Sequence, residues 1–230
     1  MAQVLRQEKS LMRLANKWWS IGVCVLLVLI ICIYLDLKLV GTIAAVICFS
    51  LFPVMDKFFK GSDGEWAVTK LLRDKLGEDW FLINDTVING AQIDHILIGP
   101  GGVFTIETKN YKGNVYGSDR SREWTNYLGK NNYKFYSPVL QGKTHSVKLA
   151  NFLKEKGVDC FVKTIVVFAG SAKVKVTSKK VPVLRLHKLI DYINSQRVEC
   201  SVDLIKQVVD LIMSKIEFSE KTKNDWKTFV

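Results

Sequence analysis

The residue types with the clearest chemical potential lie on two short apolar segments joined by a glycine-rich turn. Asp94 lies in the segment QIDHILI, and Glu107 and Lys109 lie in the segment VFTIETK that follows it. The intervening GPGG at 99–102 is typical of a tight turn, so the two segments are expected to pair as antiparallel strands. A symmetric register places Asp94 opposite Glu107, about 5 Å apart at Cβ, and alternation places Lys109 on the face of Glu107.

Two carboxylates and one ammonium group in a buried sheet need compensation, because ionised groups are costly inside a protein. A divalent cation provides it, since Mg²⁺ (or Mn²⁺) binds through one or two carboxylates together with substrate phosphates. Lys109 would then orient or deprotonate a water molecule, or stabilise charge on the phosphate under attack. The alternative is a structural ion pair between Glu107 and Lys109 at the strand end, with Asp94 in solvent.

A helix, three strands, a second helix and a fourth strand are expected to position these side chains. The motif GSDG begins the first helix, which ends at Gly77, and Ser137-Pro138 begins the second, which ends near Lys156. This αβββαβ order predicts an α/β fold with a mixed sheet. Strands are expected at 80–87, 92–98, 103–109, 161–169 and 181–184, and two further helices at 187–195 and 202–216.

Residues 110–136 form a polar stretch in which aromatic and basic residues are interspersed. Basic groups attract phosphates and aromatic rings stack on bases, so this stretch is a candidate nucleic-acid surface. A β-hairpin with cross-strand aromatic pairs is the alternative. The basic residues expected to contact nucleic acid are Lys112, Arg120, Arg122, Lys130, Lys134 and, on the following helix, Lys148.

The two histidines near these residues have different expected roles. His95 lies on the strand face opposite Asp94, where core packing is favoured over metal binding. His145 follows Gln141 by one helical turn, and it either contacts a phosphate or lies on a solvated helix face.

The string QIDHILIGPGGVFTIETKN at 92–110, with Gly64-Glu65 before it and Ser137-Pro138 and Gln141 after it, resembles the nuclease-related domain (NERD) family. This family is grouped with the PD-(D/E)xK nucleases, and the resemblance covers roughly residues 61–170. It implies a restriction-endonuclease-like domain that hydrolyses DNA or RNA phosphodiesters with Mg²⁺ or Mn²⁺.

The resemblance also implies a role for each matching residue. Asp94 and Glu107 would bind the metal, and Lys109 would position the attacking water. Glu65, on the first helix, would reach the metal directly or through water. Gln141 resembles the helix-borne glutamine of the RecB-like branch and would support the site.

A very apolar segment precedes this region. Of the 38 residues from 18 to 55, thirty are hydrophobic, and Asp36-Leu37-Lys38 breaks them into two runs, each marginally long enough to span a bilayer. The pattern favours a transmembrane helical hairpin over residues 18–56. A signal peptide and a buried soluble hairpin are the alternatives, but no suitable cleavage site follows the first run, and nothing later is apolar enough to wrap two such helices.

The +11 net charge is unevenly distributed along the chain. Residues 1–17 carry +3 and are expected to form a basic cytoplasmic leader that contacts anionic lipid, whereas 18–56 carry −1. Residues 57–230 carry +9, and they comprise the NERD-like region 57–216 and a charged, loose tail at 217–230. Positive flanks on both sides of the hairpin predict a two-span protein of the cell membrane with both termini in the cytoplasm.

Composition excludes two other classes of protein. With 48% hydrophobic residues the chain is not disordered, and five scattered cysteines without a CxxC pair support neither a disulfide scaffold nor a zinc ribbon. The sequence therefore predicts a membrane-anchored, metal-dependent nuclease. The alternatives are a catalytically silent module that tethers nucleic acid or protein at the membrane, and a membrane protein whose basic surface contacts anionic lipid. DNA and RNA, endo- and exonucleolytic cleavage, and the oligomeric state all stay open.

Overall fold

A computed structural model of the 230-residue chain describes residues 1–6, 63–196 and 200–227, with side chains up to 219. Further described residues are 20, 22–24, 26, 27, 30, 31, 34, 42, 43 and 46. Residues 1–7 and 64–230 form one compact unit, and residues 8–63 form a second.

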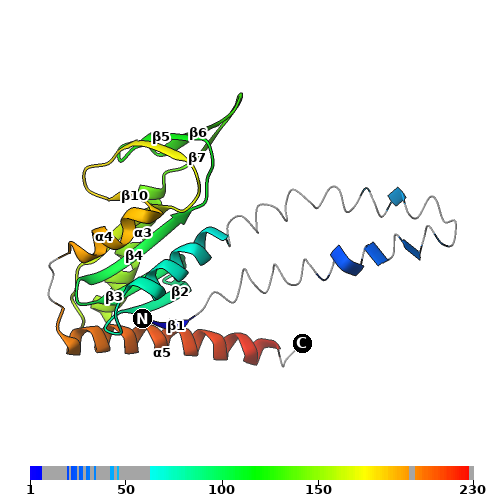
Figure 1. Ribbon diagram of the computed structural model, residues 1–230. Helices are drawn as coiled ribbons and strands as arrows, with labels where there is room; N and C mark the ends of the chain where they lie inside the picture. Colours follow the sequence, from blue (N-terminus) through cyan, green and yellow to red (C-terminus); the bar gives the residue numbers. More distant parts are fainter. Residues whose placement is uncertain are drawn as a thin grey trace. The chain divides into compact units, whose positions relative to one another are not determined.

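A six-stranded mixed sheet runs through the first unit, in the order β1-β2-β3-β4-β8-β10 (Figure 1). Strands β2, β3 and β4 are antiparallel, whereas β1, β8 and β10 run parallel to their neighbours. The strand bounds are β1 (Gln3–Arg6), β2 (Phe81–Ile88), β3 (Ala91–Gly99), β4 (Gly102–Lys109), β8 (Val162–Phe168) and β10 (Val183–Arg185).

Helices cover both faces of this sheet and make it the middle of three layers. Helix α3 (Pro138–Glu155) and helix α5 (Val202–Lys227) pack on one face, through residues such as Leu149 and Ile212. A helix at 63–75 and α4 (Leu189–Asn194), which follows the 3₁₀ turn Leu186–Lys188, pack on the other. The predicted αβββαβ order and the mixed sheet are confirmed.

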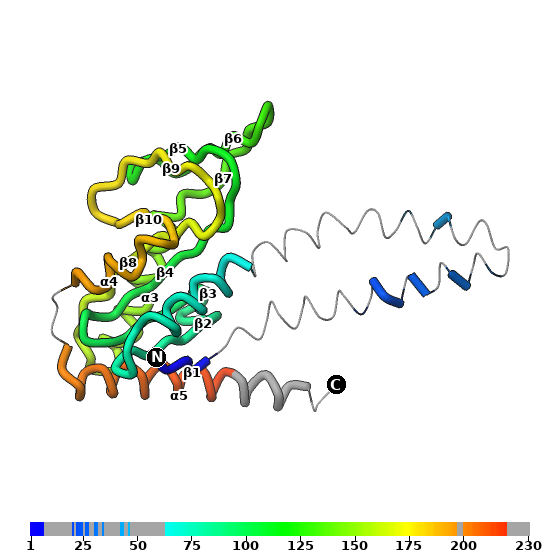
Figure 2. The backbone as a smooth tube through the Cα atoms, viewed as in Figure 1, coloured from blue at the N-terminus to red at the C-terminus, as the bar shows by residue number. Residues whose placement is uncertain are grey.

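A second sheet of four strands, in the order β7-β6-β5-β9, continues from the end of β4 (Figure 2). Its strands are β5 (Asn114–Ser118), β6 (Glu123–Leu128), β7 (Asn131–Tyr136) and β9 (Lys173–Thr177). Residues 110–136 thus contain the cross-strand aromatic hairpin that the sequence offered as an alternative. The ring centroids of Trp124 and Phe135, which are cross-strand partners, lie 6.3 Å apart.

The two ends of the first unit differ from the sequence prediction. Residues 3–6, expected in a lipid-facing leader, form β1, with Gln3 N–H donating to the Trp80 carbonyl at 2.8 Å. Val4 and Leu5 pack against opposite core clusters, so they belong to the sheet and do not face lipid. The tail expected to be loose from 217 is helical to Lys227, because its Glu and Lys residues are good helix formers.

The predicted transmembrane hairpin at 18–56 lies largely outside the described residues. Among the residues that the structure does describe, no helix combines the length and hydrophobicity needed to cross a membrane. The described residues of this segment are helical and expose large apolar side chains, including Val23, Leu26, Leu27, Ile30 and Ile31.

Candidate active site

The antiparallel register of β3 and β4 brings the predicted acidic residues together. Gly99 pairs with Gly102 and His95 pairs with Ile106, which confirms the symmetric register expected from the sequence. Asp94 and Glu107 each lie one residue beyond His95 and Ile106, the last pair of this ladder. Thr108 N–H donates a hydrogen bond of 2.8 Å to Asp94 Oδ2, so the Asp94 carboxylate is held against β4.

Glu107 is the most buried of the charged groups in the site, with a side chain that is 1% exposed. Lys109 Nζ donates to Glu107 Oε1 at 2.6 Å and to Gln141 Oε1 at 3.2 Å. Gln141 comes from the first turn of α3. The structure therefore joins four of the five predicted catalytic residues, namely Asp94, Glu107, Lys109 and Gln141.

Helix α3 lies close to β4 because of local features of the sequence. Ser137 caps the helix through its hydroxyl, which accepts from Leu140 N–H, and Pro138 occupies the first turn as predicted. A Cβ atom at Gly142 would lie 2.5 Å from Thr164 Cγ2 and 3.6 Å from Glu107 Cβ. Only glycine permits this approach, and it brings the Gln141 side chain within reach of Lys109.

His145 is a site residue that the sequence did not assign to the catalytic set. It is 8% exposed, and its Nδ1 lies 3.2 Å from Glu107 Oε2. The arrangement still leaves Oε2 buried without a well-formed hydrogen bond. The available signal was its spacing of four residues from Gln141, which places both on one face of α3.

The protonation states in the site follow from burial and mutual charge. Desolvation, together with the nearby charge of Glu107, raises the pKa of Asp94 to about 7. Burial opposes ionisation of Glu107, but the contacts with His145 and Lys109 outweigh it and hold the pKa of Glu107 below its usual value. Burial likewise opposes the charge on Lys109, but Glu107 outweighs it and raises the pKa of Lys109. At neutral pH, Glu107 and Lys109 are therefore ionised, whereas the raised pKa of Asp94 favours its protonated form far more than in an ordinary aspartate.

Glu65 lies on the helix at 63–75, near the end of β4. A Cβ atom on the preceding Gly64 would lie 2.7 Å from Asn110 Cβ, so this helix begins beside the residue that follows Lys109. Within the described part of the chain, no three His, Cys, Asp or Glu side chains form a cluster able to hold a metal. The role of Glu65 at the metal, either directly or through water, stays a prediction.

The acidic pair fits a hard divalent cation in other respects. Carboxylate oxygens are the donors that Mg²⁺ and Mn²⁺ prefer, and Glu107 Oε2 is a buried oxygen that lacks a hydrogen bond. Asp94 and Glu107 would hold the ion, and water and substrate would supply its remaining ligands.

His95 lies in the core, as predicted, on the other side of β3. It is fully buried, with Nδ1 2.8 Å from Asn84 Oδ1 and Nε2 3.1 Å from Thr108 Oγ1. Burial lowers the pKa of His95 to about 4, so the imidazole is neutral. Because Thr108 also donates its N–H to Asp94, this network supports the strand segment that carries the site.

This buried imidazole predicts an acid-sensitive fold. The pKa of His95 is lower in the folded chain than in the unfolded chain, so the unfolded state binds the extra proton as the pH falls below about 6.5. We expect His95 to cost up to about 3 kcal/mol of unfolding free energy between pH 6.5 and 4. Urea unfolding of wild type and His95→Asn at several pH values measures this, and an equally steep loss in both would contradict it.

The basic residues predicted to contact nucleic acid lie mostly on the second sheet. Lys112, Arg120, Arg122, Lys130 and Lys134 are exposed on its strands and connections, and Lys148 is partly buried on α3. Within the described residues, none of these six forms a hydrogen bond or ion pair with the acidic pair.

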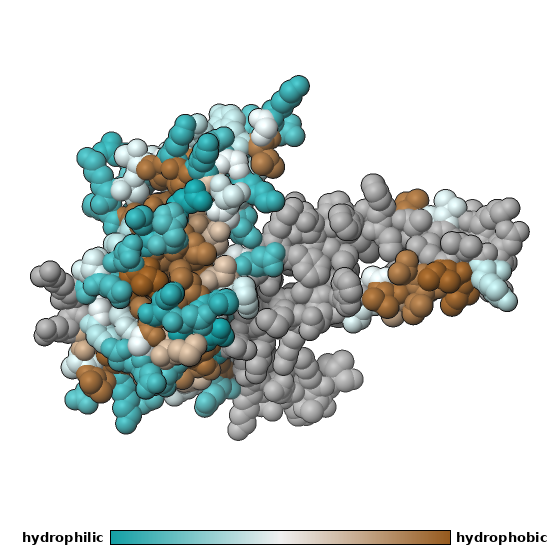
Figure 3. Space-filling model, viewed as in Figure 1, coloured by the Kyte–Doolittle hydropathy of each residue, from teal (hydrophilic) through white to brown (hydrophobic). Residues whose placement is uncertain are grey.

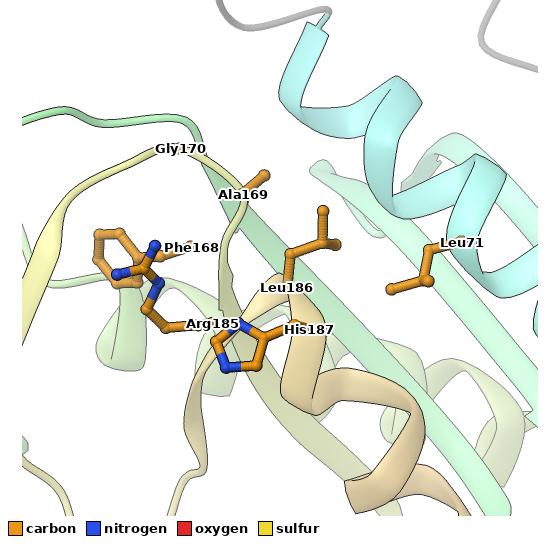
Figure 4. Close-up of a pocket in the computed structure, with 7 residues that line it drawn as sticks. All are labelled: Leu71, Phe168, Ala169, Gly170, Arg185, Leu186 and His187. Carbon is orange, nitrogen blue, oxygen red and sulfur yellow. The ribbon is translucent and has the colours of Figure 1, made fainter.

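A pocket of about 290 Å³ opens near the C-terminal ends of β8 and β10 (Figure 4). Arg185 and His187 line it together with apolar side chains that include Leu71 and Phe168. Phe168 pairs with Lys109 in the β4–β8 ladder, so the pocket lies at the same end of the sheet as Lys109. The space-filling view shows apolar side chains exposed between hydrophilic patches on this part of the molecule (Figure 3).

Comparison with known proteins gives three findings. Residues 60–169 match the family described as the nuclease-related domain (NERD). An uncharacterized protein of Bacillus anthracis is 32% identical over 107 residues, which are 44% of this chain and 50% of that protein. The chain therefore spans about half the length of this relative.

The third finding is a structural similarity. The structure of Pyrococcus furiosus SfsA in complex with Ca²⁺ is 18% identical, covers 69% of this chain and 55% of its own, and has a TM-score of 0.27. This likeness is too low to support an argument about fold or metal.

Proposed function

Because residues 60–169 are a nuclease-related domain, we propose that this protein is a metal-dependent nuclease that hydrolyses DNA or RNA phosphodiesters. The observation that carries the proposal is the convergence of Asp94, Glu107 and Lys109, with a buried Glu107 and a raised Asp94 pKa. Perturbed carboxyl groups of this kind cluster at functional sites.

Each side chain has a role consistent with its surroundings. A divalent ion, when bound, would polarise the phosphate and lower the pKa of a water molecule. Asp94 and Glu107 would hold that ion. Gln141 accepts a hydrogen bond from Lys109 and so fixes the direction of its ammonium group.

Lys109 acts as a cation in this proposal. Its pKa is raised, so at neutral pH it is an ammonium group that donates hydrogen bonds and does not accept a proton. Of the roles expected from the sequence, orientation of the water and stabilisation of the phosphate charge are therefore favoured over deprotonation of the water.

We further propose that the segment 18–56 anchors the protein in the cell membrane, with both termini in the cytoplasm. Strand β1 and the helix at 63–75 belong to one compact unit, so both ends of the intervening segment attach to the same domain. A segment attached in this way crosses a membrane an even number of times, which supports a two-span hairpin. Anionic lipid is the proposed partner of the basic residues between β1 and the first span.

Cleavage assays with the full-length chain in detergent test this function. We expect Mg²⁺ or Mn²⁺ to support cleavage of labelled DNA or RNA, EDTA to stop it, and Glu107→Gln to lower the rate by more than about 100-fold. Glu155→Gln, at an exposed position on the last turn of α3, is the matched control and should leave the rate unchanged.

Two results would contradict the proposal. Binding of nucleic acid without cleavage under any divalent ion would favour the silent module. Cleavage that persists undiminished in Glu107→Gln would place the activity elsewhere. In membranes isolated before detergent is added, the chain should stay with the membrane fraction after a carbonate wash, and its release would contradict the anchor.

A further inference from the structure

The second sheet carries two sets of aromatic residues on its two faces. On the inner face, Trp124 and Phe135 pack together, and Trp124 is fully buried. On the outer face, Tyr116, Tyr127 and Tyr136 are 40%, 45% and 47% exposed. The inner set explains the stability of the sheet, but the outer set remains open to solvent.

The strand registers define this outer face. Tyr116 pairs with Lys175 and with Thr125, and Thr125 pairs in turn with Lys134. Because paired residues share a face, these side chains point to the same side of the sheet. We call this surface the outer tyrosine face; it comprises Asn114, Tyr116, Ser118, Glu123, Thr125, Tyr127, Asn132, Lys134, Tyr136, Lys173, Lys175 and Thr177.

Two of the tyrosines form a small platform with a lysine. The rings of Tyr116 and Tyr127 meet edge to face, with centroids 5.5 Å apart. Lys175 Nζ lies 5.3 Å from the centre of the Tyr116 ring and 3.2 Å from its hydroxyl. Rings and an ammonium group are thus held together at an exposed position, which suits a ligand with flat rings and negative charge.

The charge of the outer tyrosine face favours an anion. It contains three lysines and one acid, Glu123, whose carboxylate lies 3.7 Å from Lys134 Nζ. Lys173 and Lys175 lie on β9, on the same side as Tyr116 and Tyr127. The surface therefore combines stacking groups with a positive charge, as in proteins that bind single strands.

This face is continuous with the strand that bears the catalytic residues. Strands β4 and β8 pair in parallel, from the pair Val103–Val162 to the pair Lys109–Phe168. Strands β5 and β9 also pair in parallel, up to the pair Ser118–Thr177, and the difference in residue number between partners is the same in both ladders. Hydrogen bonds from Ala169 N–H to the Lys109 carbonyl and from Ala172 N–H to the Tyr111 carbonyl bridge the two ladders. The outer tyrosine face therefore begins five residues beyond Lys109.

We propose that the outer tyrosine face binds single-stranded nucleic acid, with bases stacked on Tyr116 and Tyr127 and phosphates near Lys173 and Lys175. This surface would thereby select an unpaired strand as the substrate. The inference about the substrate rests on the proposed nuclease function. Protein rings stack on bases only when these bases are separated from their neighbours, which a duplex does not offer.

The test measures binding of the full-length chain in EDTA, so cleavage plays no part. A fluorescein-labelled mixed-sequence 20-mer is used as a single strand and as a duplex, with anisotropy as the readout. The double variant Tyr116→Leu/Tyr127→Leu keeps apolar side chains but removes the rings. Phe161→Leu, at an exposed ring before β8, is the matched control.

We expect the tyrosine double variant to bind the single strand at least about 30-fold more weakly than wild type. Its affinity for the duplex should change by less than about threefold, and so should the affinity of Phe161→Leu for the single strand. In a second variant, Lys173→Ala/Lys175→Ala, the single-strand binding constant K should depend less steeply on salt. The magnitude of the slope of log K against log salt concentration should fall by about 0.7 for each lysine removed. The inference would be overturned if the tyrosine variant had an unchanged thermal melt and bound the single strand as tightly as wild type. It would also be overturned if the variant lost affinity equally for the single strand and for the duplex.

The outcomes separate this inference from the nuclease proposal. If single-strand binding depends on the tyrosines but no cleavage occurs in Mn²⁺, the proposed role of the outer tyrosine face is supported and the nuclease proposal is overturned. If cleavage occurs but single-strand binding does not depend on the tyrosines, the nuclease proposal is supported and the proposed role of the outer tyrosine face is overturned.

Discussion

Replacing Lys109 with methionine is expected to abolish cleavage and to lower the free energy of unfolding by about 3–5 kcal/mol. Glu107 is almost completely buried, and Lys109 Nζ is its closest cation, 2.6 Å away. Removing the ammonium group leaves a charged carboxylate in the protein interior beside Asp94. Such an uncompensated charge costs far more than an exposed ion pair contributes.

A double variant separates stability from catalysis at this position. Glu107→Gln/Lys109→Met removes both charges, so it should recover most of the lost unfolding free energy while remaining inactive. Urea unfolding followed by tryptophan fluorescence, to which the buried Trp80 and Trp124 contribute, measures stability, and the cleavage assay measures activity. A stable and inactive double variant is the expected result. Full activity in either variant would reduce the Glu107–Lys109 contact to a structural ion pair.

Asp94→Asn is expected to make the fold more stable and the protein inactive. The pKa of Asp94 is about 7 in the folded chain, above its value in the unfolded chain. The folded state therefore favours the protonated group, and stability is lost as the pH rises from about 4 to 7 in the absence of a divalent ion. Asparagine does not titrate, and its side-chain oxygen still accepts from Thr108 N–H.

The gain should depend on pH in a defined way. At pH 8 without divalent ion, we expect Asp94→Asn to be more stable than wild type by about 2–4 kcal/mol, because ionised Asp94 destabilises the fold there. Near pH 4 the two should be equal within about 0.5 kcal/mol. Thermal or urea unfolding at both pH values measures the difference. A loss of stability at pH 8 would show that ionised Asp94 is well accommodated and would contradict the electrostatic account.

The centre of the site could be predicted from the sequence because that part depends on local rules. The GPGG turn favours one symmetric register, and its continuation by one residue beyond His95 and Ile106 brings Asp94 and Glu107 together. Alternation along β4 then places Lys109 beside Glu107, and the Ser137-Pro138 start sets the turn of α3 that carries Gln141.

Other features depend on contacts between distant segments. His145 approaches Glu107 only because Gly142 allows α3 to lie against β4 and β8, which sequence spacing does not reveal. Strand β1 is four residues long and pairs with a strand that begins at Phe81, so it carries no periodic signal of its own. Strand β9 has a signal, since Val174 and Val176 alternate with lysines, but so short a run is ambiguous without its partner β5.

The central claim is that Asp94 and Glu107 share a divalent ion. The binding of Mn²⁺ to the full-length chain tests this claim most directly. Loss of the free Mn²⁺ signal in electron paramagnetic resonance at pH 7.5 gives the stoichiometry and affinity. We predict one ion bound per chain, at least about 100-fold weaker binding in Asp94→Asn and Glu107→Gln, and no change in Glu155→Gln. Mn²⁺ binding that is absent in wild type, or that is equally tight in Asp94→Asn, would contradict the account.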